Sequence, residues 1–148
     1  MLEAVDAAIS VWGADRVGLH LAPRADAHSM GDSNLAATFG HVAREAGKRK
    51  LAFLFARESL AEPRLGPALK QAFGGIYIAN QLLTAESAAM LLEKGEADAV
   101  AFGQLFIANP DLPRRLAQGA PLNAPEAATF YASGPQGYTD YPSLADAS

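Results

Sequence analysis

The stretch "RVGLHLA" at residues 16–22 decides between the folds that this chain could adopt. Its residues alternate between the two faces of a strand. One face carries Val17, Leu19 and Leu21, and the other carries Gly18, His20 and Ala22. The central strands of an open, doubly wound sheet are apolar on both faces because helices cover both. A small and polar second face instead suits the interior of a barrel beside a bound ligand.

The same unit of strand and helix repeats along the rest of the chain. Further strands are predicted at residues 51–56, 75–79 and 98–103. Helices are predicted at 2–12, along the stripe of Leu35, Phe39 and Val42, around Leu69 and Phe73, at 85–94, and from Asn109 to Gly119. Asp32, Ser33 and Asn34 offer an N-cap for the second of these helices, and Thr84 and Asn109 are predicted caps of the last two. Strands that alternate with helices indicate a parallel sheet with right-handed crossovers.

Two architectures fit this order of elements. One is a four-stranded open sheet with helices on both faces, and the other is half of a (β/α)8 TIM barrel, since a whole barrel needs at least ~200 residues. The first strand favours the half-barrel. We therefore predict an α/β fold with four βα units at residues 1–119, followed by a Gly- and Pro-rich tail at 120–148.

Composition and charge narrow the classes of function. Half of the 148 residues are hydrophobic, which is enough for a core, and the net charge of −4 argues against a nucleic-acid partner. Cysteine is absent, so no disulfide or thiolate metal site is expected, and His28 and His41 do not form a metal pair. No apolar run approaches the ~18 residues of a membrane span. Acidic residues stand where an export signal would be basic, so we expect a cytoplasmic protein that acts on small molecules.

Polar residues follow each predicted strand, where parallel α/β folds bind their ligands. They are His20, Arg57, Glu58, Asn80, Gln81, Gly103 and Gln104. Neither a pair of catalytic carboxylates nor a Ser-His-Asp site can be built from this set. Barrels often bind phosphate after their last two strands, which would place a phosphate at residues 80–81 and 103–104. Arg57 has two interpretations, a ligand contact or a surface ion pair with Glu58 or Glu62.

Three blocks of sequence resemble a known family. They are "RVGLHLAP" (16–23), "DAVAFGQLFIANPDL" (98–112) and "FYASGPQGYTDYP" (130–142). In this order and separation they are similar to blocks of the Old Yellow Enzyme family of FMN-dependent ene reductases. The resemblance covers essentially the whole chain, but it corresponds to the C-terminal half of a family barrel, strands five to eight.

The resemblance implies a function. The family's barrel holds FMN, takes hydride from NADH or NADPH, and reduces an activated alkene. By motif, His20 is implied to lie near flavin N1 and O2, and the phosphate contacts are implied to be Asn80, Gln81, Gly103 and Gln104. Tyr138 is the implied substrate-facing aromatic residue of the tail.

This sequence departs from the family pattern at two of these positions. The family usually has arginine where this chain has His20 and Gln104, so a positive charge is lost at each. The family's proton-donor tyrosine and its carbonyl-binding pair lie in the N-terminal half. The resemblance thus implies that this chain has no catalytic residue of its own and is an incomplete enzyme by itself.

Three functions stay open at this point. The chain could be half of an FMN-dependent ene reductase that works with an N-terminal half. It could be a self-associating, non-catalytic half-barrel, natural or engineered, that forms a homodimer. It could also be an unrelated four-stranded phosphate-binding domain.

Overall fold

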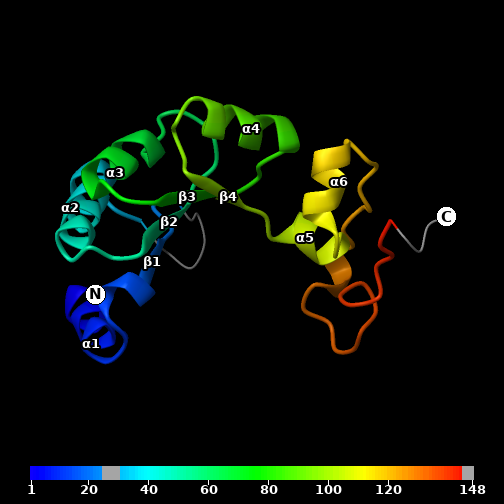
Figure 1. The fold of residues 1–148 in the computed structure, drawn as a ribbon, viewed down its shortest axis with the longest axis horizontal. Helices are drawn as coiled ribbons and strands as arrows, with labels where there is room; N and C mark the ends of the chain where they lie inside the picture. The colour runs from blue at the N-terminus through cyan, green and yellow to red at the C-terminus, as the bar shows by residue number, and fades with distance from the viewer. Residues whose placement is uncertain (25–30, 145–148) are drawn as a thin grey trace. The chain divides into compact units, whose positions relative to one another are not determined.

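The computed structural model describes residues 1–24 and 31–144 of the chain. By their contacts the residues divide into two compact units, residues 1–101 and residues 102–148. We call them the sheet unit and the tail unit (Figure 1). Residues 102–119, which the sequence pattern groups with the βα units, cluster with the tail.

The sheet unit contains four parallel strands in the order in which the chain makes them. They are β1 (Gly18–Leu21), β2 (Phe53–Arg57), β3 (Tyr77–Asn80) and β4 (Ala99–Ala101), and the sheet order is β1-β2-β3-β4. Each strand pairs in parallel with the next one along the chain. This sequential order is that of successive barrel strands, so the predicted half of a (β/α)8 barrel is confirmed.

Three helices lie on one face of this sheet: α2 (Leu35–Lys48), α3 (Gly66–Phe73) and α4 (Ala85–Glu93) (Figure 1). Buried residues on that side include Leu54 of β2 and Leu69 of α3. The expected caps form, because the Asn34 side chain accepts the Ala37 N–H, and Thr84 makes a capping box with Ser87 at the start of α4.

The predicted first helix is α1 (Leu2–Trp12), which a short 3-10 turn, η1 (Ala14–Arg16), joins to β1. Val5 is its one buried residue. Its link to α2 is polar, since Arg49 donates from Nε and Nη2 to the two carboxylate oxygens of Asp6 at 2.6 and 3.0 Å. Because two parallel hydrogen bonds join the guanidinium and the carboxylate, the pair is held in one orientation although it is exposed to solvent.

The opposite face of the sheet carries the residues that alternate with the buried ones. In register across the strands these are Gly18 and His20, Phe53, Phe55 and Arg57, Ile78 and Asn80, and Ala99 and Ala101. A side chain at Gly18 would collide with the ring of Phe53, its partner on β2, so the glycine makes room for that ring. Phe53 is still 36% exposed, and Ile76, just before β3, is 54% exposed. We call this surface the inner face.

The tail unit begins with a helix that the sequence did not predict, α5 (Gln104–Ala108), followed by α6 (Leu112–Gln118) and a 3-10 turn, η2 (Ala127–Thr129). The predicted cap at Asn109 is wrong. Asp111 is the N-cap residue of α6, whereas Asn109 ends α5 and is completely buried. Gly119 closes α6 in the left-handed conformation, as expected.

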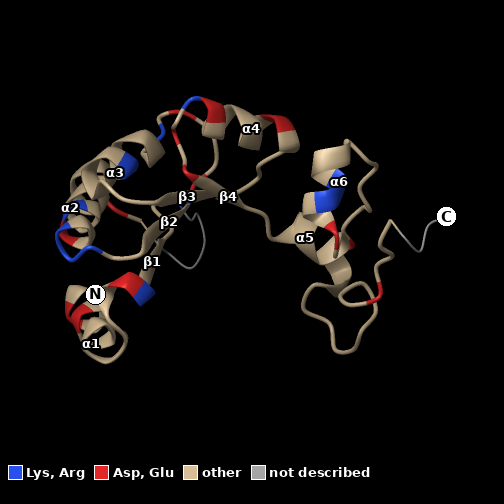
Figure 2. Ribbon diagram, in the orientation of Figure 1, with Lys and Arg blue, Asp and Glu red and all other residues tan. Residues whose placement is uncertain are grey.

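The charged residues do not separate into a basic and an acidic element. Figure 2 shows both signs within α2 and around α6, where they form ion pairs such as Glu45–Lys48 and Asp111–Arg115. Within the described ranges, 1–24 and 31–144, none of the helices has the length and apolarity that crossing a membrane would need.

Candidate functional site

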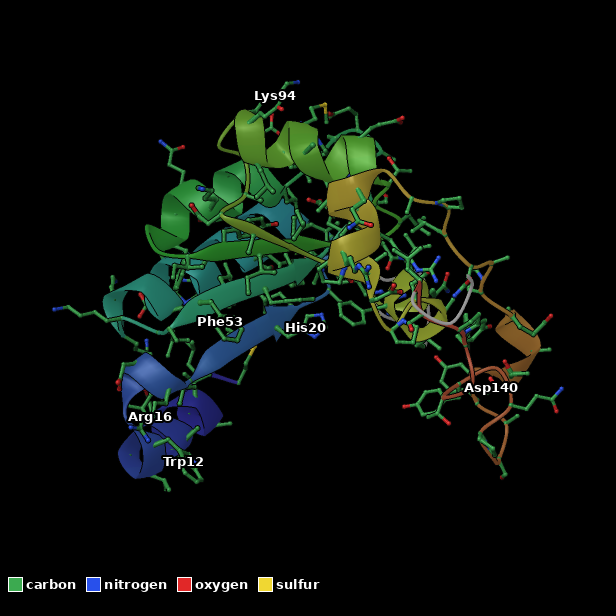
Figure 3. The ribbon with its side chains drawn as sticks, turned by 45° about the vertical axis from the view of Figure 1, so that its right-hand side comes forward. Trp12, Arg16, His20, Phe53, Lys94 and Asp140 are labelled. Carbon is green, nitrogen blue, oxygen red and sulfur yellow. The ribbon has the colours of Figure 1, made fainter. Side chains whose placement is uncertain are left out.

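The polar residues of the sheet unit gather at the carboxyl ends of the strands on the inner face. Arg57 of β2 is in register with Asn80 of β3, which is in register with Ala101 of β4. His20 stands on β1, in register with Phe55. Figure 3 shows His20 and Phe53 on the neighbouring first two strands. The structure therefore brings His20, Arg57 and Asn80 to the strand ends and face where the sequence placed a ligand.

His20 is exposed, and an aromatic contact holds its ring. The ring centroids of His20 and Phe55 lie 4.4 Å apart at an angle of 71°, an edge-to-face arrangement. This contact orients the imidazole while leaving the residue open to a ligand on the inner face.

Asn80 and Gln81 use part of their side-chain amides inside the protein. Asn80 Nδ2 donates to the carbonyl of Ala101 at 2.7 Å, which joins the ends of β3 and β4. Gln81 Oε1 accepts a hydrogen bond from Arg57 Nε at 3.0 Å. Gln81 also has a φ of 106°, and Leu82 a φ of 53°, so the chain turns sharply directly after β3. Each amide keeps N–H capacity beyond these bonds.

Neither proposed ion pair of Arg57 forms. Its partner is Gln81, whereas Glu62 pairs with Arg64. Glu58 points to the helix-covered side of the sheet, where it is 8% exposed. Because successive strand residues face opposite ways, Glu58 is turned away from the residue beside it.

Glu58 has a structural role that the sequence did not reveal. Its carboxylate accepts the N–H groups of Leu65 and Gly66 at 2.8 and 2.7 Å, at the start of α3, and Arg24 Nε lies 3.7 Å away. Burial raises the pKa of the Tyr77 hydroxyl, and the Glu58 carboxylate raises it further. The signal available in the sequence was the helix start at Gly66-Pro67, which begins eight residues beyond Glu58.

In the tail unit, Gly103 and Gln104 are exposed at the start of α5. The carbonyl of Gly103 accepts the N–H groups of Phe106 and Ile107, which closes the first turn. A Cβ added at Gly103 would meet nothing within 4 Å, and its φ of −96° is open to residues with side chains. The protein's own packing therefore does not require glycine here, but a ligand that approaches the backbone closely would.

A hollow of about 430 Å³ adjoins Gly103 in the same unit. It is lined by Gly103, Phe106, Ile107, Pro110, Tyr138 and Thr139. The structure thus brings Gly103 and Tyr138, which are 35 positions apart in sequence, to one surface. Tyr138 is 53% exposed there, so its ring is available to a ligand.

A buried arginine holds the segment that carries Tyr138. Arg115 is 4% exposed, and its guanidinium donates to Asp111 Oδ1 at 2.6 Å and to the carbonyls of Pro121 and Pro142 at 2.5 and 2.8 Å. Asp111 Oδ2 accepts the N–H of Leu144 at 2.8 Å. One guanidinium therefore bonds to both ends of the segment 121–142, an arrangement that no local sequence pattern predicts.

Further polar groups complete this attachment. Asn123 N–H donates to Asn109 Oδ1 at 2.7 Å, and Asn123 Nδ2 reaches the carbonyl of Ala108 at 2.8 Å. The Tyr141 hydroxyl accepts the Glu126 N–H at 2.8 Å. The tail is consequently a structured loop held by specific hydrogen bonds.

No metal site is built from the described residues, since none of their His, Asp and Glu side chains gather in groups of three that could hold an ion. His41 is exposed on α2, and His28 lies outside the described residues. The candidate groups of the sheet unit are thus hydrogen-bond donors and an imidazole, and those of the tail unit are an aromatic ring and exposed backbone.

Four parallel strands in sequential order, with polar residues at their carboxyl ends, define half of a (β/α)8 barrel, a fold whose ligands bind at the strand ends. No protein-family model matches the chain. Among curated proteins, it is 38% identical over 161 residues to a putative 12-oxophytodienoate reductase of Oryza sativa subsp. japonica, covering 98% of this chain and 40% of that protein. It is 37% identical to a probable flavin mononucleotide-dependent alkene reductase of Leishmania infantum, covering 96% of this chain and 40% of that protein.

Solved structures show a similarity to the same family. The old yellow enzyme from Trypanosoma cruzi superimposes with a TM-score of 0.89 at 33% identity, covering 97% of this chain and 39% of that one. Morphinone reductase in complex with tetrahydroNAD superimposes with a TM-score of 0.90 at 41% identity, covering 97% of this chain and 40% of that one. The chain belongs to the Old Yellow Enzyme family and corresponds to the C-terminal half of a family protein. It spans about 40% of the length of the relatives it matches.

Proposed function

We propose that this chain forms the phosphate-binding half of an FMN-dependent alkene reductase whose reductant is NADH or NADPH. The observation that carries the proposal is Gly103, an exposed glycine that no contact of the protein requires, beside a hollow lined by aromatic rings. Such a position lets backbone N–H groups approach a phosphate closely. The similarity to a probable FMN-dependent alkene reductase over 96% of the chain supports the same ligand.

The residues present fit FMN in kind. Within the tail unit, the exposed Gly103 and Gln104 have N–H groups that suit a phosphate. Within the sheet unit, the side-chain amides of Asn80 and Gln81 are donors of the same kind. His20 offers an imidazole to the flavin ring, neutral as a single hydrogen-bond donor or protonated as a cation. Tyr138, exposed in the hollow, faces the substrate in this proposal.

Bound FMN would supply hydride transfer from its reduced ring to an activated alkene. The part of this chain is to bind and orient: its N–H groups hold the phosphate, and His20 donates to the ring. The proton donor and the groups that bind the substrate carbonyl come, in this proposal, from residues outside this chain. The chain itself thus contributes no catalytic residue.

The exposed inner face supports a second proposal, that this chain associates with another chain or chain segment. Phe53 and Ile76 expose apolar surface at 36% and 54%, and a parallel strand edge offers unpaired backbone groups. We propose that further strands cover this face in a cytoplasmic assembly, supplied either by an N-terminal half or by a second copy of the chain in a homodimer.

Titration of the purified chain with FMN, followed by flavin fluorescence, tests the cofactor. FMN should bind and riboflavin, which lacks the phosphate, should bind markedly worse. Equal affinities would contradict the phosphate-anchored site, and binding of inorganic phosphate without any flavin binding would favour an unrelated phosphate-binding domain.

Light scattering together with intact mass tests the association. A dimer mass, or a second polypeptide that co-purifies, is expected, and Phe53→Lys should weaken the association because it places a charge on the inner face. Exposed Lys94, the C-cap residue of α4, provides the matched control as Lys94→Glu. A monomer that melts cooperatively would contradict the proposal, whereas a dimer that binds no FMN would favour a non-catalytic half-barrel.

A further inference from the structure

A small polar cavity lies on the helix-covered side of the sheet, and the proposed flavin site does not use it. It measures about 20 Å³ and lies among β2, β3, α3, α4 and the connections between them. Its polar lining consists of Glu58, Arg64, Tyr77 and Glu96. A polar cavity needs roughly 10–15 Å³ to hold one water molecule, so this one has room for a single water and for little else.

Tyr77 places its hydroxyl at this cavity. The residue is 3% exposed, and two small residues that also line the cavity, Ala56 and Ala79, leave room for its ring. The hydrogen bonds of Tyr77 to the described residues all run through its backbone, so its hydroxyl has no partner among them. Every fully enclosed polar side-chain atom of those residues does have a partner, so this hydroxyl is open to a molecule of the size of water. Because a buried hydroxyl without a partner is unfavourable, a further group is needed to complete its hydrogen bonding.

The carboxylate of Glu58 borders the same space. A Cβ added at Gly66 would lie 3.0 Å from the Tyr77 hydroxyl oxygen and 3.4 Å from Glu58 Oε2, so both oxygens adjoin the free volume beside this glycine. No direct hydrogen bond joins the two side chains, since the Glu58 carboxylate bonds to the Leu65 and Gly66 N–H groups instead. Each carboxylate oxygen can accept a second hydrogen bond. The hydroxyl and the carboxylate therefore offer a donor and an acceptor to one small molecule.

The charged groups at the cavity already have partners of opposite sign. Arg64 Nη1 donates to Glu96 Oε2 at 2.7 Å. On the other side, Arg24 Nε lies 3.7 Å from Glu58 Oε1. A further cation would meet the two guanidinium groups and an anion would meet the two carboxylates, so neither gains enough to offset its lost hydration. A neutral molecule that both accepts and donates hydrogen bonds fits this balance.

We propose that this cavity binds one ordered water molecule, which bridges Tyr77 and Glu58. The Tyr77 hydroxyl donates to the water oxygen, and the water donates to Glu58 Oε2. The raised pKa of Tyr77 keeps its hydroxyl protonated and therefore able to donate. Because Glu58 also holds the Leu65 and Gly66 N–H groups, the water joins β3 to the start of α3. The site lies wholly within the sheet unit and does not depend on FMN.

Water-selective NOE spectra of the full chain, with Tyr77→Phe as the variant, test the bridge. The parent should show a cross-peak between a long-lived water and the Gly66 N–H. Tyr77→Phe keeps the ring but removes the donor, so this cross-peak should disappear. Protection of the Leu65 and Gly66 N–H groups against hydrogen exchange should fall by about fivefold, as for one lost hydrogen bond. Tyr131→Phe removes the same hydroxyl from a fully exposed tyrosine and, as the matched control, should change neither quantity.

Gly66→Ala tests the position of the water by a second route. Its added methyl group would enter the space beside the Tyr77 hydroxyl and Glu58 Oε2, while both of these side chains stay in the protein. The water cross-peak should therefore disappear in this variant too. If it persists unchanged, the water lies elsewhere and the proposed bridge is wrong.

A crystal structure of the full chain provides the direct check. One water is expected within about 3 Å of both the Tyr77 hydroxyl oxygen and Glu58 Oε2. Two other outcomes would overturn the inference: a cavity without density between these oxygens, or a peak with several oxygen contacts near 2.4 Å, which would indicate a cation. A Tyr77→Phe protein that keeps both the cross-peak and the exchange protection of the parent would contradict it as well.

Discussion

Arg115 Nε donates to Asp111 Oδ1 at 2.6 Å, one turn apart on α6, and this pair fastens the tail of the protein. The remaining donors of Arg115 reach Pro121 and Pro142, and the second oxygen of Asp111 accepts the Leu144 N–H. A buried ion pair is weak evidence for stability by itself, because both charges lose their hydration. Here its geometric effect is clear, since it joins the two ends of the segment that carries Tyr138.

Replacement of Arg115 by methionine should release this segment. The side chain keeps much of its apolar volume, but the bonds to both proline carbonyls are lost, which costs about 2 kcal/mol in the stability of the tail unit. Hydrogen exchange at Leu144 and proteolysis within residues 121–142 should both become faster. Arg114→Met, at the exposed neighbour on α6, is the matched control. Unchanged exchange at Leu144 in Arg115→Met would contradict the role of the pair.

The attachment of the tail should weaken in acid. The Leu144 N–H lowers the pKa of the Asp111 carboxyl below its usual value of 3.8, and the Arg115 guanidinium lowers it further. A carboxyl whose pKa is lower in the folded state stabilises the fold above its unfolded pKa and loses that contribution as the pH falls through the folded value. The protection factor of the Leu144 N–H, its exchange rate relative to that of an unstructured amide at the same pH, should therefore fall below about pH 4. In Asp111→Asn this protection should be low already at neutral pH, and it should change less between pH 3 and 7.

A cation at position 20 should strengthen flavin binding. His20 is exposed on the inner face and touches Phe55 through its ring edge, so arginine can extend from the same place without losing a buried contact. A permanent charge near the flavin favours its anionic reduced form. His20→Arg should tighten FMN binding by about fivefold or raise the flavin reduction potential, as for one hydrogen bond made charge-assisted. His41→Arg on α2 should change neither quantity, and an unchanged His20→Arg would show that residue 20 does not touch the flavin.

The elements with local signals were predictable from the sequence. Alternation marked β1, and the polar residues Asn34 and Thr84 marked the starts of α2 and α4. In contrast, α5 is five residues long and has no side-chain cap, so no local signal predicted it. The fourth strand was predicted to run to residue 103, whereas β4 ends at Ala101.

The residues that were misinterpreted have partners far away in sequence. The pattern Asn109-Pro110-Asp111 is typical of a helix start, but the side chain of Asn109 bonds to Asn123, which lies 14 residues further on. Arg57 likewise bonds to Gln81 on the next strand and not to a nearby acid. Local rules of capping and ion pairing cannot identify such partners, because only the packed fold brings them together.

Gly103 provides the sharpest test of the phosphate site, because binding and stability should separate there. A Cβ at Gly103 would meet nothing within 4 Å, so Gly103→Val should leave the unfolding midpoint of the tail unit unchanged. The added methyl groups would nevertheless occupy the space in which a phosphate approaches the backbone, and FMN binding should be abolished. Gly137 behaves in the opposite way: its φ is 66° and a side chain there would collide with Thr129, so Gly137→Ala should destabilise the tail. Thermal unfolding and FMN titration of both variants, with Gly103→Ala as a smaller step, make the comparison. A Gly103→Val protein that folds normally and still binds FMN would show that the phosphate lies elsewhere.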